Sequence, residues 1–192
     1  MPLPDLRIEP LLPADTRRIE QAARVLVAAF AEGWPSAWPD LESARAEVAE
    51  VLAPDCLCRA AFIGDDLAGW VGGIPDYDGR VWELHPLAVD PAWQGRGIGR
   101  ALVEDLCGQA AQRGALTVLL GTDDETGMTT LTGADLYADP WQHIRAIRNL
   151  RRHPYEFYQK LGFTIVGVVP DANGPGRPDI LMARRVEGYN KG

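Results

Sequence analysis

The amino-acid sequence predicts an α/β fold, and three features of its pattern support that prediction. Two segments near the start carry apolar residues at helical spacing. Residues 59–74 read as a β-hairpin, and residues 80–120 follow a strand, helix, strand order. With 192 residues, 46% of them hydrophobic, the chain can bury one good core. We therefore expect a single compact domain over residues 1–192.

Composition excludes several classes of protein. The formal net charge of -8, from 27 acidic and 19 basic side chains, argues against a protein that binds nucleic-acid phosphates and suits a cationic small molecule better. The three cysteines have neither the even number of a disulfide framework nor the paired spacing of a zinc site, so we expect no metal. Without a membrane-spanning apolar run or a signal peptide, a cytoplasmic protein with no membrane partner is expected.

Capping residues define the two expected helices. Asp15 is a plausible N-cap for the first helix, which Gly33 and the following proline end. Asp40 caps the second, and Pro54 stops it. Between the helices, the stretch GWPSAWPD places two tryptophans among prolines, and Trp34 there offers a flat face for a sugar ring.

The rest of the chain predicts strands, a third helix and one long loop. The third helix follows residue 97 and ends near Gly114, and residues 122–150 form the loop, rich in acidic side chains. Pro86 interrupts one strand and suggests a bulge or an edge, whereas Leu116–Leu120 reads as a strand of the buried type. The expected strands, in chain order, are residues 59–63, 67–74, 80–90, 116–120, 164–169 and 179–186.

A glycine-rich stretch after the third of these strands is the sharpest chemical signal. Its glycines let backbone N–H groups converge, the start of a helix adds positive potential, and two arginines add charged donors. The stretch fits neither a P-loop nor the dinucleotide fingerprint. A tight strand-to-helix turn is the structural alternative, but the pattern favours pyrophosphate binding by Gln94, Gly95, Arg96, Gly97, Ile98, Gly99 and Arg100.

These residues resemble the Q-x-x-G-x-G motif of the GNAT acetyltransferases, with Gln94, Gly97 and Gly99 in the motif positions. The stretch from Tyr158 to Phe163 resembles the family's Y-x-x-x-G-F signature. The resemblance covers roughly residues 60–186. It implies a mixed, mostly antiparallel, twisted sheet of six to seven strands flanked by helices, with the strands at 80–90 and 116–120 splayed apart.

The same resemblance implies a cofactor and part of a mechanism. Acetyl-CoA would lie with its pyrophosphate on the glycine-rich stretch and its pantetheine arm paired with the backbone of Leu87, Ala88 and Val89. A backbone N–H near Leu87 would hold the oxyanion, and Tyr158 would hydrogen-bond or protonate the leaving thiolate. Pro154 stands where the family often has alanine, and the segment before it is unusually long. Both departures leave the acceptor side less defined than the cofactor side.

On the acceptor side, the stretches GWP, WELHPLAV and DANGPGRPDILMARR resemble aminoglycoside 6'-N-acetyltransferases. Aminoglycosides are polycations, which the acidic segments would attract. Glu83, flanked by apolar Trp82 and Leu84, is the first candidate for the base that deprotonates the amine, and Asp123 is its rival. Glu83 is alternatively a counter-ion or a partner of Arg80. The remaining expected acceptor contacts are Trp34, Tyr77, Asp78, His85, Asp124, Glu125 and Asp139.

Three functions therefore stay open at this point. The first is transfer of an acetyl group to the 6'-amine of an aminoglycoside by direct transfer in a ternary complex, as in antibiotic resistance. The second is acetylation of another amine, such as a polyamine, an amino acid or a protein N-terminus. The third is a non-catalytic module that binds acyl-CoA. The resemblance also implies a homodimer, with the C-terminal strands as the contact.

Overall fold

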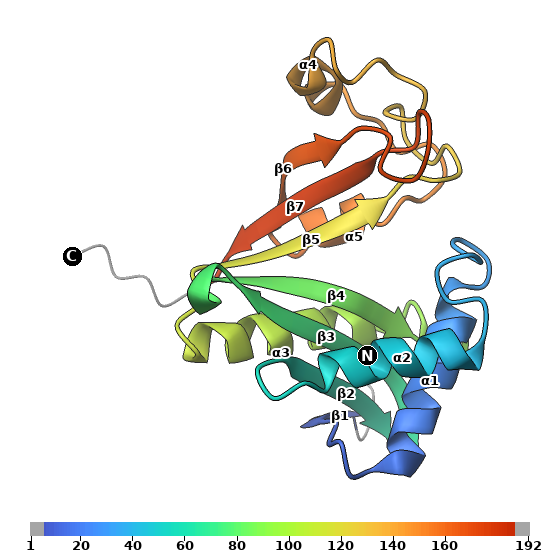
Figure 1. The fold of residues 1–192 in the computed structure, drawn as a ribbon, viewed down its shortest axis with the longest axis vertical. Coiled ribbons are helices and arrows are strands. Elements are labelled where there is room, and N and C mark those ends of the chain that lie inside the picture. The colour runs from blue at the N-terminus through green and yellow to red at the C-terminus, as the bar shows by residue number, and fades with distance from the viewer. Residues whose placement is uncertain (1–5, 187–192) are drawn as a thin grey trace. The chain divides into compact units, whose positions relative to one another are not determined.

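The computed structural model describes residues 6–186, and the chain forms two compact units (Figure 1). The first unit comprises residues 6–116 together with Val186, and the second comprises residues 117–185. Seven strands lie within the described residues, in agreement with the six or seven expected, and the α/β class is confirmed. The single domain over residues 1–192 stays a prediction.

The first unit is a four-stranded antiparallel sheet with three α-helices. Neighbouring strands pair in the order β1-β2-β3-β4. The five-residue β1, which the sequence pattern did not predict, pairs with β2 along its whole length. In chain order the elements are β1 (Leu6–Pro10), α1 (Thr16–Phe30), α2 (Leu41–Val51), β2 (Leu57–Ile63), β3 (Asp66–Asp76), β4 (Val81–Val89) and α3 (Ile98–Gln112), with short 3-10 helices at Tyr77–Gly79 and Pro91–Trp93.

The predicted helix caps are confirmed. The Asp15 side chain accepts a hydrogen bond from the Arg18 N–H at the start of α1, and the Asp40 side chain accepts one from the Ser43 N–H at the start of α2. Each carboxylate satisfies one backbone donor that has no partner inside its helix. Within residues 6–186, no helix combines the length and the apolar character needed to cross a membrane.

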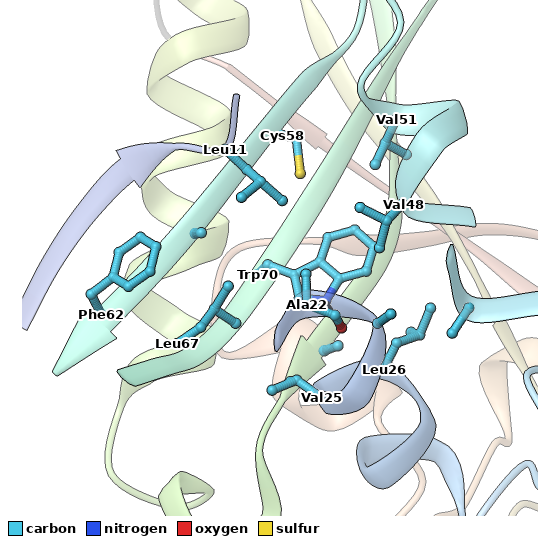
Figure 2. Packing of buried hydrophobic residues seen from close by; sticks show 14 residues of the cluster. Leu11, Ala22, Val25, Leu26, Val48, Val51, Cys58, Phe62, Leu67 and Trp70 are labelled. Carbon is cyan, nitrogen blue, oxygen red and sulfur yellow. Dashed lines mark hydrogen bonds between the residues drawn. The ribbon is translucent and has the colours of Figure 1, made fainter. Parts of the chain in front are cut away.

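The core between α1, α2 and the sheet is built around Trp70 (Figure 2). This side chain is fully buried, and its indole N–H donates to the carbonyl of Ala22 on α1 at 2.9 Å. Leu26 from α1 and Val48 from α2 lie in the same cluster. The amphipathic faces that predict the two helices therefore pack on one face of the sheet.

Alternation along β3 places helices on both faces of this sheet. Trp70 and Gly72 face α1 and α2, and a Cβ atom on Gly72 would lie 2.7 Å from a Val51 methyl carbon. Gly69 and Gly73 face α3, where Cβ atoms would lie 3.3 and 2.7 Å from methyl carbons of leucines on that helix. Because glycine has no side chain, α3 packs directly against the β3 backbone. These contacts hold the middle of α3, at Leu102 and Leu106, against the sheet.

The irregularity that Pro86 predicts is a β-bulge. Leu84 pairs with Gly73 and Leu87 pairs with Val71, so two residues of β4 lie opposite the single Gly72 of β3. The peptide bond before Pro86 is cis. The bulge bends β4 in its C-terminal half, next to the residues expected to contact the cofactor.

The second unit is a three-stranded antiparallel sheet, in the order β5-β7-β6, with two short helices. Strand β5 is not of the fully buried type that the sequence predicts. Val118 and Leu120 are buried, but Thr117 and Leu119, on the other face, are partly exposed, because one face of an antiparallel sheet commonly meets solvent. The elements are β5 (Thr117–Asp123), α4 (Pro140–Arg145), α5 (Tyr155–Gln159), β6 (Thr164–Val169) and β7 (Asp179–Arg185).

Candidate active site

The first part of the site is the glycine loop, residues 94–99, which connects β4 to α3. Gly95 and Gly97 have φ angles of 72° and 92°, a region that other L-residues rarely adopt. Gly97 is the N-cap of α3, and no side chain caps this helix start. The N–H groups of the first turn therefore point out of the helix without intrahelical partners.

Three side-chain contacts hold the glycine loop in place. The Gln94 amide donates to the Val89 carbonyl at the end of β4, at 3.0 Å. The Asp90 carboxylate accepts from the Ala92 N–H at 2.8 Å. The Arg96 guanidinium lies over the Trp93 ring, 4.9 Å from its centroid. The glutamine that marks the motif in the sequence thus ties the loop to the strand, although the residue is exposed.

The space above the glycine loop is open. Cβ atoms added at Gly95 or Gly97 would meet no atom within 4 Å. Converging N–H groups, the positive end of the α3 dipole and two arginines make this a site for an anion with several oxygens. The geometry therefore fits the pyrophosphate that the sequence motif predicts.

Glu83 lies on β4, between the two apolar residues that the sequence interpretation expected to surround its carboxylate. Trp82 and Leu84 are buried, whereas Glu83 is exposed, because successive side chains of a strand point to opposite faces. The expected apolar surroundings of this carboxylate are therefore wrong. Within residues 6–186, Glu83 forms no ion pair with Arg80. An exposed carboxylate is free to meet an incoming amine.

His85 contacts Glu47 of α2, a residue that sequence reasoning did not select. The His85 Nε2 atom lies 3.5 Å from one carboxylate oxygen of Glu47, and the Trp38 indole N–H donates to the other oxygen at 3.2 Å. The Trp38 and His85 rings are 5.9 Å apart. No sequence spacing links α2 to β4, so this cluster emerges only from the fold. It connects the tryptophan-rich loop to the site strand.

The other expected acceptor contacts of the first unit lie on loops. Trp34 contacts the ring of Phe30, with centroids 5.9 Å apart. Tyr77 is 67% exposed, and both Tyr77 and Asp78 have positive φ angles, of 48° and 57°. Residues whose backbone is held in a sparsely populated conformation are frequent at binding sites, and here one of them carries an exposed aromatic ring.

In the second unit, Asp123 ends β5 and is held by two neighbours. Its carboxylate accepts from the Asn173 amide at 2.6 Å, and its carbonyl lies 3.1 Å from the Nε2 atom of His153. Neither Asn173 nor His153 was selected from the sequence. Their contacts join residues 30 and 50 positions apart, which no local motif reveals.

The sequence interpretation expected Asp124 to contact the cationic acceptor, but the structure does not place its carboxylate at the surface. The residue is fully buried, and its carboxylate accepts hydrogen bonds from the Met128 N–H at 2.6 Å and from the Thr129 N–H and hydroxyl at 2.8 and 2.7 Å. Burial alone raises its pKa, but hydrogen bonds from Thr132, Thr129 and Met128 outweigh that effect and lower it. Asp124 therefore organises the loop after β5.

Asp124→Asn is expected to lower the free energy of unfolding by about 1.5–3 kcal/mol at neutral pH, since it weakens hydrogen bonds to a buried charge. Because the folded pKa lies below the unfolded value of about 3.9, this stabilisation is complete above that pH and is lost as pH falls through the folded pKa. Urea unfolding at pH of about 7 and about 3 measures both effects. Equal losses in Asp124→Asn and the neighbouring Glu125→Gln would contradict the assignment.

The two remaining acidic residues differ in their surroundings. Asp139 is exposed and is the N-cap of α4, where its carboxylate accepts from the Gln142 N–H at 3.0 Å. Glu125 is half-buried in the loop after β5. Of the expected acidic contacts in this unit, Asp139 and Asp124 thus already serve as hydrogen-bond acceptors for the backbone.

Tyr158 lies on α5, in an aromatic setting. Its ring contacts Phe157 and Phe163, with centroids 5.0 and 5.7 Å away. Burial raises the pKa of its hydroxyl well above the usual range, so the group stays protonated at any working pH. A buried, protonated hydroxyl can donate a hydrogen bond, although its raised pKa makes it a weaker acid than an exposed tyrosine.

Comparisons with known proteins agree with this geometry. Residues 19–129 match the model of the acetyltransferase (GNAT) family. A crystal structure of an aminoglycoside 6'-N-acetyltransferase complexed with coenzyme A is 39% identical, with a TM-score of 0.88, over 96% of this chain and 99% of that one. The chain therefore belongs to the GNAT acetyltransferase family, whose members transfer an acetyl group from acetyl-CoA.

Two mycobacterial relatives match over shorter stretches. The uncharacterized protein ML0378 of Mycobacterium leprae (strain TN) is 36% identical over 62% of this chain, which spans 31% of that relative. N-alpha-acetyltransferase RimI of Mycobacterium tuberculosis (strain ATCC 25618 / H37Rv) is 31% identical over 47% of this chain, which spans 56% of it. The chain thus covers about a third and about half the length of these two relatives.

Proposed function

We propose that this protein transfers the acetyl group of acetyl-CoA to a primary amine of a cationic amino sugar, most simply the 6'-amine of an aminoglycoside. The observation that carries the proposal is the open glycine loop at the start of α3, placed directly after the strand that presents Glu83. The loop gives the pyrophosphate of the cofactor a place, and the preceding strand carries a carboxylate suited to an amine. The solved relative named as an aminoglycoside 6'-N-acetyltransferase supports the choice of acceptor.

The glycine loop and β4 hold the cofactor in this proposal. The N–H groups of residues 95–99, with Arg96 and Arg100, hold the pyrophosphate, and the backbone of Leu87, Ala88 and Val89 pairs with the pantetheine arm. Acetyl-CoA supplies the acetyl group as a reactive thioester. The protein contributes position and charge, which accounts for a site rich in backbone donors.

The chain's titratable residues move the protons. An attacking amine must be neutral, so Glu83 accepts its proton, either directly or through a water molecule, with Asp123 as the alternative base. Tyr158 donates a proton or a hydrogen bond to the sulfur that leaves. No covalent bond to the enzyme is needed, because the amine attacks the thioester carbonyl carbon as the carbon–sulfur bond breaks.

Tyr158→Phe is expected to lower kcat by about 10- to 100-fold, the value of one hydrogen bond to a developing charge. The dissociation constant of acetyl-CoA should change little, since the bond matters only as the thioester breaks. Steady-state kinetics and calorimetry measure the two quantities. Tyr155→Phe, one helical turn earlier and also buried, is the matched control and should keep kcat. Parallel losses of rate and cofactor affinity would make Tyr158 a binding residue instead.

The acceptor is held by charge and by flat surfaces. Asp78, Glu83, Glu125 and Asp139 attract the ammonium groups, while the exposed Tyr77 ring and the half-buried Trp34 ring pack against sugar rings. Thiol release from acetyl-CoA, measured with a panel of aminoglycosides, polyamines, amino acids and peptides, tests the proposal. We expect release with aminoglycosides carrying a 6'-amine and none with those lacking it.

A second candidate acceptor is a protein N-terminus, which the match to N-alpha-acetyltransferase RimI favours. In the same panel, release with peptides and not with aminoglycosides would establish it. Binding of acetyl-CoA without release from any amine would instead indicate a non-catalytic acyl-CoA-binding module. The three functions therefore give three different results in one assay.

We also propose a cytoplasmic homodimer in which β6 and β7 form the contact. Strand β6 ends the β5-β7-β6 order, and Val166 and Val169 on it are 44% and 42% exposed. Sedimentation equilibrium should show a dimer that Val166→Lys dissociates. A monomer at all concentrations would contradict this proposal.

A further inference from the structure

His153 is a buried titratable residue to which the proposed mechanism gives no role. It is 2% exposed and lies just before Pro154, the N-cap of α5. Its backbone is fixed by one neighbour: the Asn149 side chain accepts from the His153 N–H at 2.8 Å and donates to the His153 carbonyl at 2.9 Å. The backbone of His153 is therefore held by hydrogen bonds at both its N–H and its carbonyl.

The two imidazole nitrogens contact two different elements. Nε2 lies 3.1 Å from the carbonyl oxygen of Asp123, the last residue of β5. Nδ1 accepts from the backbone N–H of Tyr155, the first residue of α5, at 3.2 Å. One side chain thus bridges the end of the strand that carries one candidate base and the start of the helix that carries Tyr158.

These partners determine the protonation state of the ring. A backbone N–H can only donate, so Nδ1 must keep its lone pair, and a carbonyl can only accept, so Nε2 must carry the proton. His153 is therefore neutral, with its hydrogen on Nε2. Burial lowers the pKa of His153. The hydrogen bond with the Asp123 carbonyl and the charges of the Asp124 and Asp123 carboxylates act in the opposite direction, but their effect is smaller. A second proton would have to enter at Nδ1, facing the Tyr155 N–H.

The bridge also replaces a missing helix cap. Pro154 has no side-chain hydrogen-bonding group, so the first N–H of α5 depends on His153 for its partner. Tyr158 follows within one turn, and its own N–H bonds to the Pro154 carbonyl at 3.2 Å. The position of the Tyr158 hydroxyl therefore follows from the place where α5 begins.

We propose that His153 is a positioning residue for acetyl transfer: its Nε2–H imidazole joins the last carbonyl of β5 to the first N–H of α5 and so sets the place of Tyr158. The inference rests on the proposed function, in which Tyr158 is the proton donor. The imidazole itself touches neither substrate nor cofactor in this assignment.

The first test needs no activity. Nitrogen-15 NMR of the histidine side chains should show His153 as the neutral tautomer protonated at Nε2, unchanged as pH falls through about 6.5, where an ordinary histidine titrates. His143, on α4, is the internal comparison. A hydrogen on Nδ1, or a cation at neutral pH, would overturn the proposal.

The second test is a double-mutant cycle. His153→Asn keeps an acceptor near Tyr155 but cannot reach Asp123, whereas His153→Gln keeps a donor for Asp123 but loses the acceptor. Each variant breaks one end of the bridge, so each should lower kcat about tenfold, the rate equivalent of one net hydrogen bond. The affinity for acetyl-CoA, which the first unit supplies, should not change, and His143→Asn should behave as the parent.

The cycle separates positioning from general damage. If His153 acts through Tyr158, neither substitution should lower kcat further in the Tyr158→Phe background. Additive losses, or a fall in cofactor affinity, would show a merely structural role and overturn the proposal. If Tyr158→Phe is fully active, the proposed role of Tyr158 fails and the kinetic part of this inference fails with it. The tautomer then still decides whether His153 bridges the two elements.

Discussion

Gly97→Val is expected to abolish binding of acetyl-CoA, with a loss of at least about a hundredfold in affinity. Two effects add. The φ angle of 92° is strained for any side chain, and the isopropyl group would occupy the open space in which the pyrophosphate is proposed to lie. Isothermal titration calorimetry with acetyl-CoA measures the loss directly.

The chain offers a matched control for the backbone strain. Gly114, just past the other end of α3, has a φ angle of 88° and equally open surroundings. Gly114→Val therefore carries the same conformational cost, about 1–2 kcal/mol, without touching the glycine loop. Thermal unfolding should show similar destabilisation of both variants. Unchanged cofactor affinity in folded Gly97→Val would place the pyrophosphate elsewhere.

Glu83→Gln is expected to cut kcat by about two to four powers of ten and to remove the acid limb of the pH–rate profile. The amide is nearly isosteric with the carboxylate but cannot take a proton from the amine. The profile of kcat against pH, measured with saturating aminoglycoside and acetyl-CoA, tests this. Asp78→Asn is the matched control, because Asp78 is an exposed carboxylate on a neighbouring loop and should affect only KM.

Other outcomes assign Glu83 a different role. A counter-ion would show a raised KM in Glu83→Gln with kcat and its pH dependence intact. If kcat survives in Glu83→Gln but collapses in Asp123→Asn, the base lies at the end of β5. If both variants keep kcat, no single side chain removes the proton, and the acidic residues serve to hold the cationic sugar.

Local signals predicted most of the first unit. Asp15 and Asp40 cap α1 and α2 as expected, and Gly64 forms the tight turn of the β2–β3 hairpin with a φ angle of 59°. Each of these features depends on residues within one turn of one another. Strand β1 was missed because its five residues, the last of them a proline, are too few for alternation to be visible.

The site was predictable to the extent that its residues form a contiguous motif. Gln94 and Gly97 are three positions apart and belong to one loop, so their arrangement at the start of a helix follows from the local sequence pattern. Asp124 and Glu47 were misjudged or missed for the opposite reason. The burial of Asp124 depends on the loop that follows it and folds back over it. The contact of Glu47 with His85 joins two residues that are 38 positions apart in the sequence.

The glycines of β3 lie beside the strand that leads into the glycine loop, since Gly69 pairs with Val89 of β4. A Cβ atom on Gly69 would lie 2.8 Å from the Ala88 carbonyl oxygen of β4, and one on Gly73 would lie 2.7 Å from a methyl carbon of Leu106 on α3. A single methyl group on Gly69 would therefore push β4 away, whereas one on Gly73 would displace the Leu106 side chain. A shift of β4 at Ala88 would reach the glycine loop that follows this strand, and with it the anion site. Laboratory evolution of altered cofactor preference therefore has a second place to act, at interior positions that no map of ligand contacts would include.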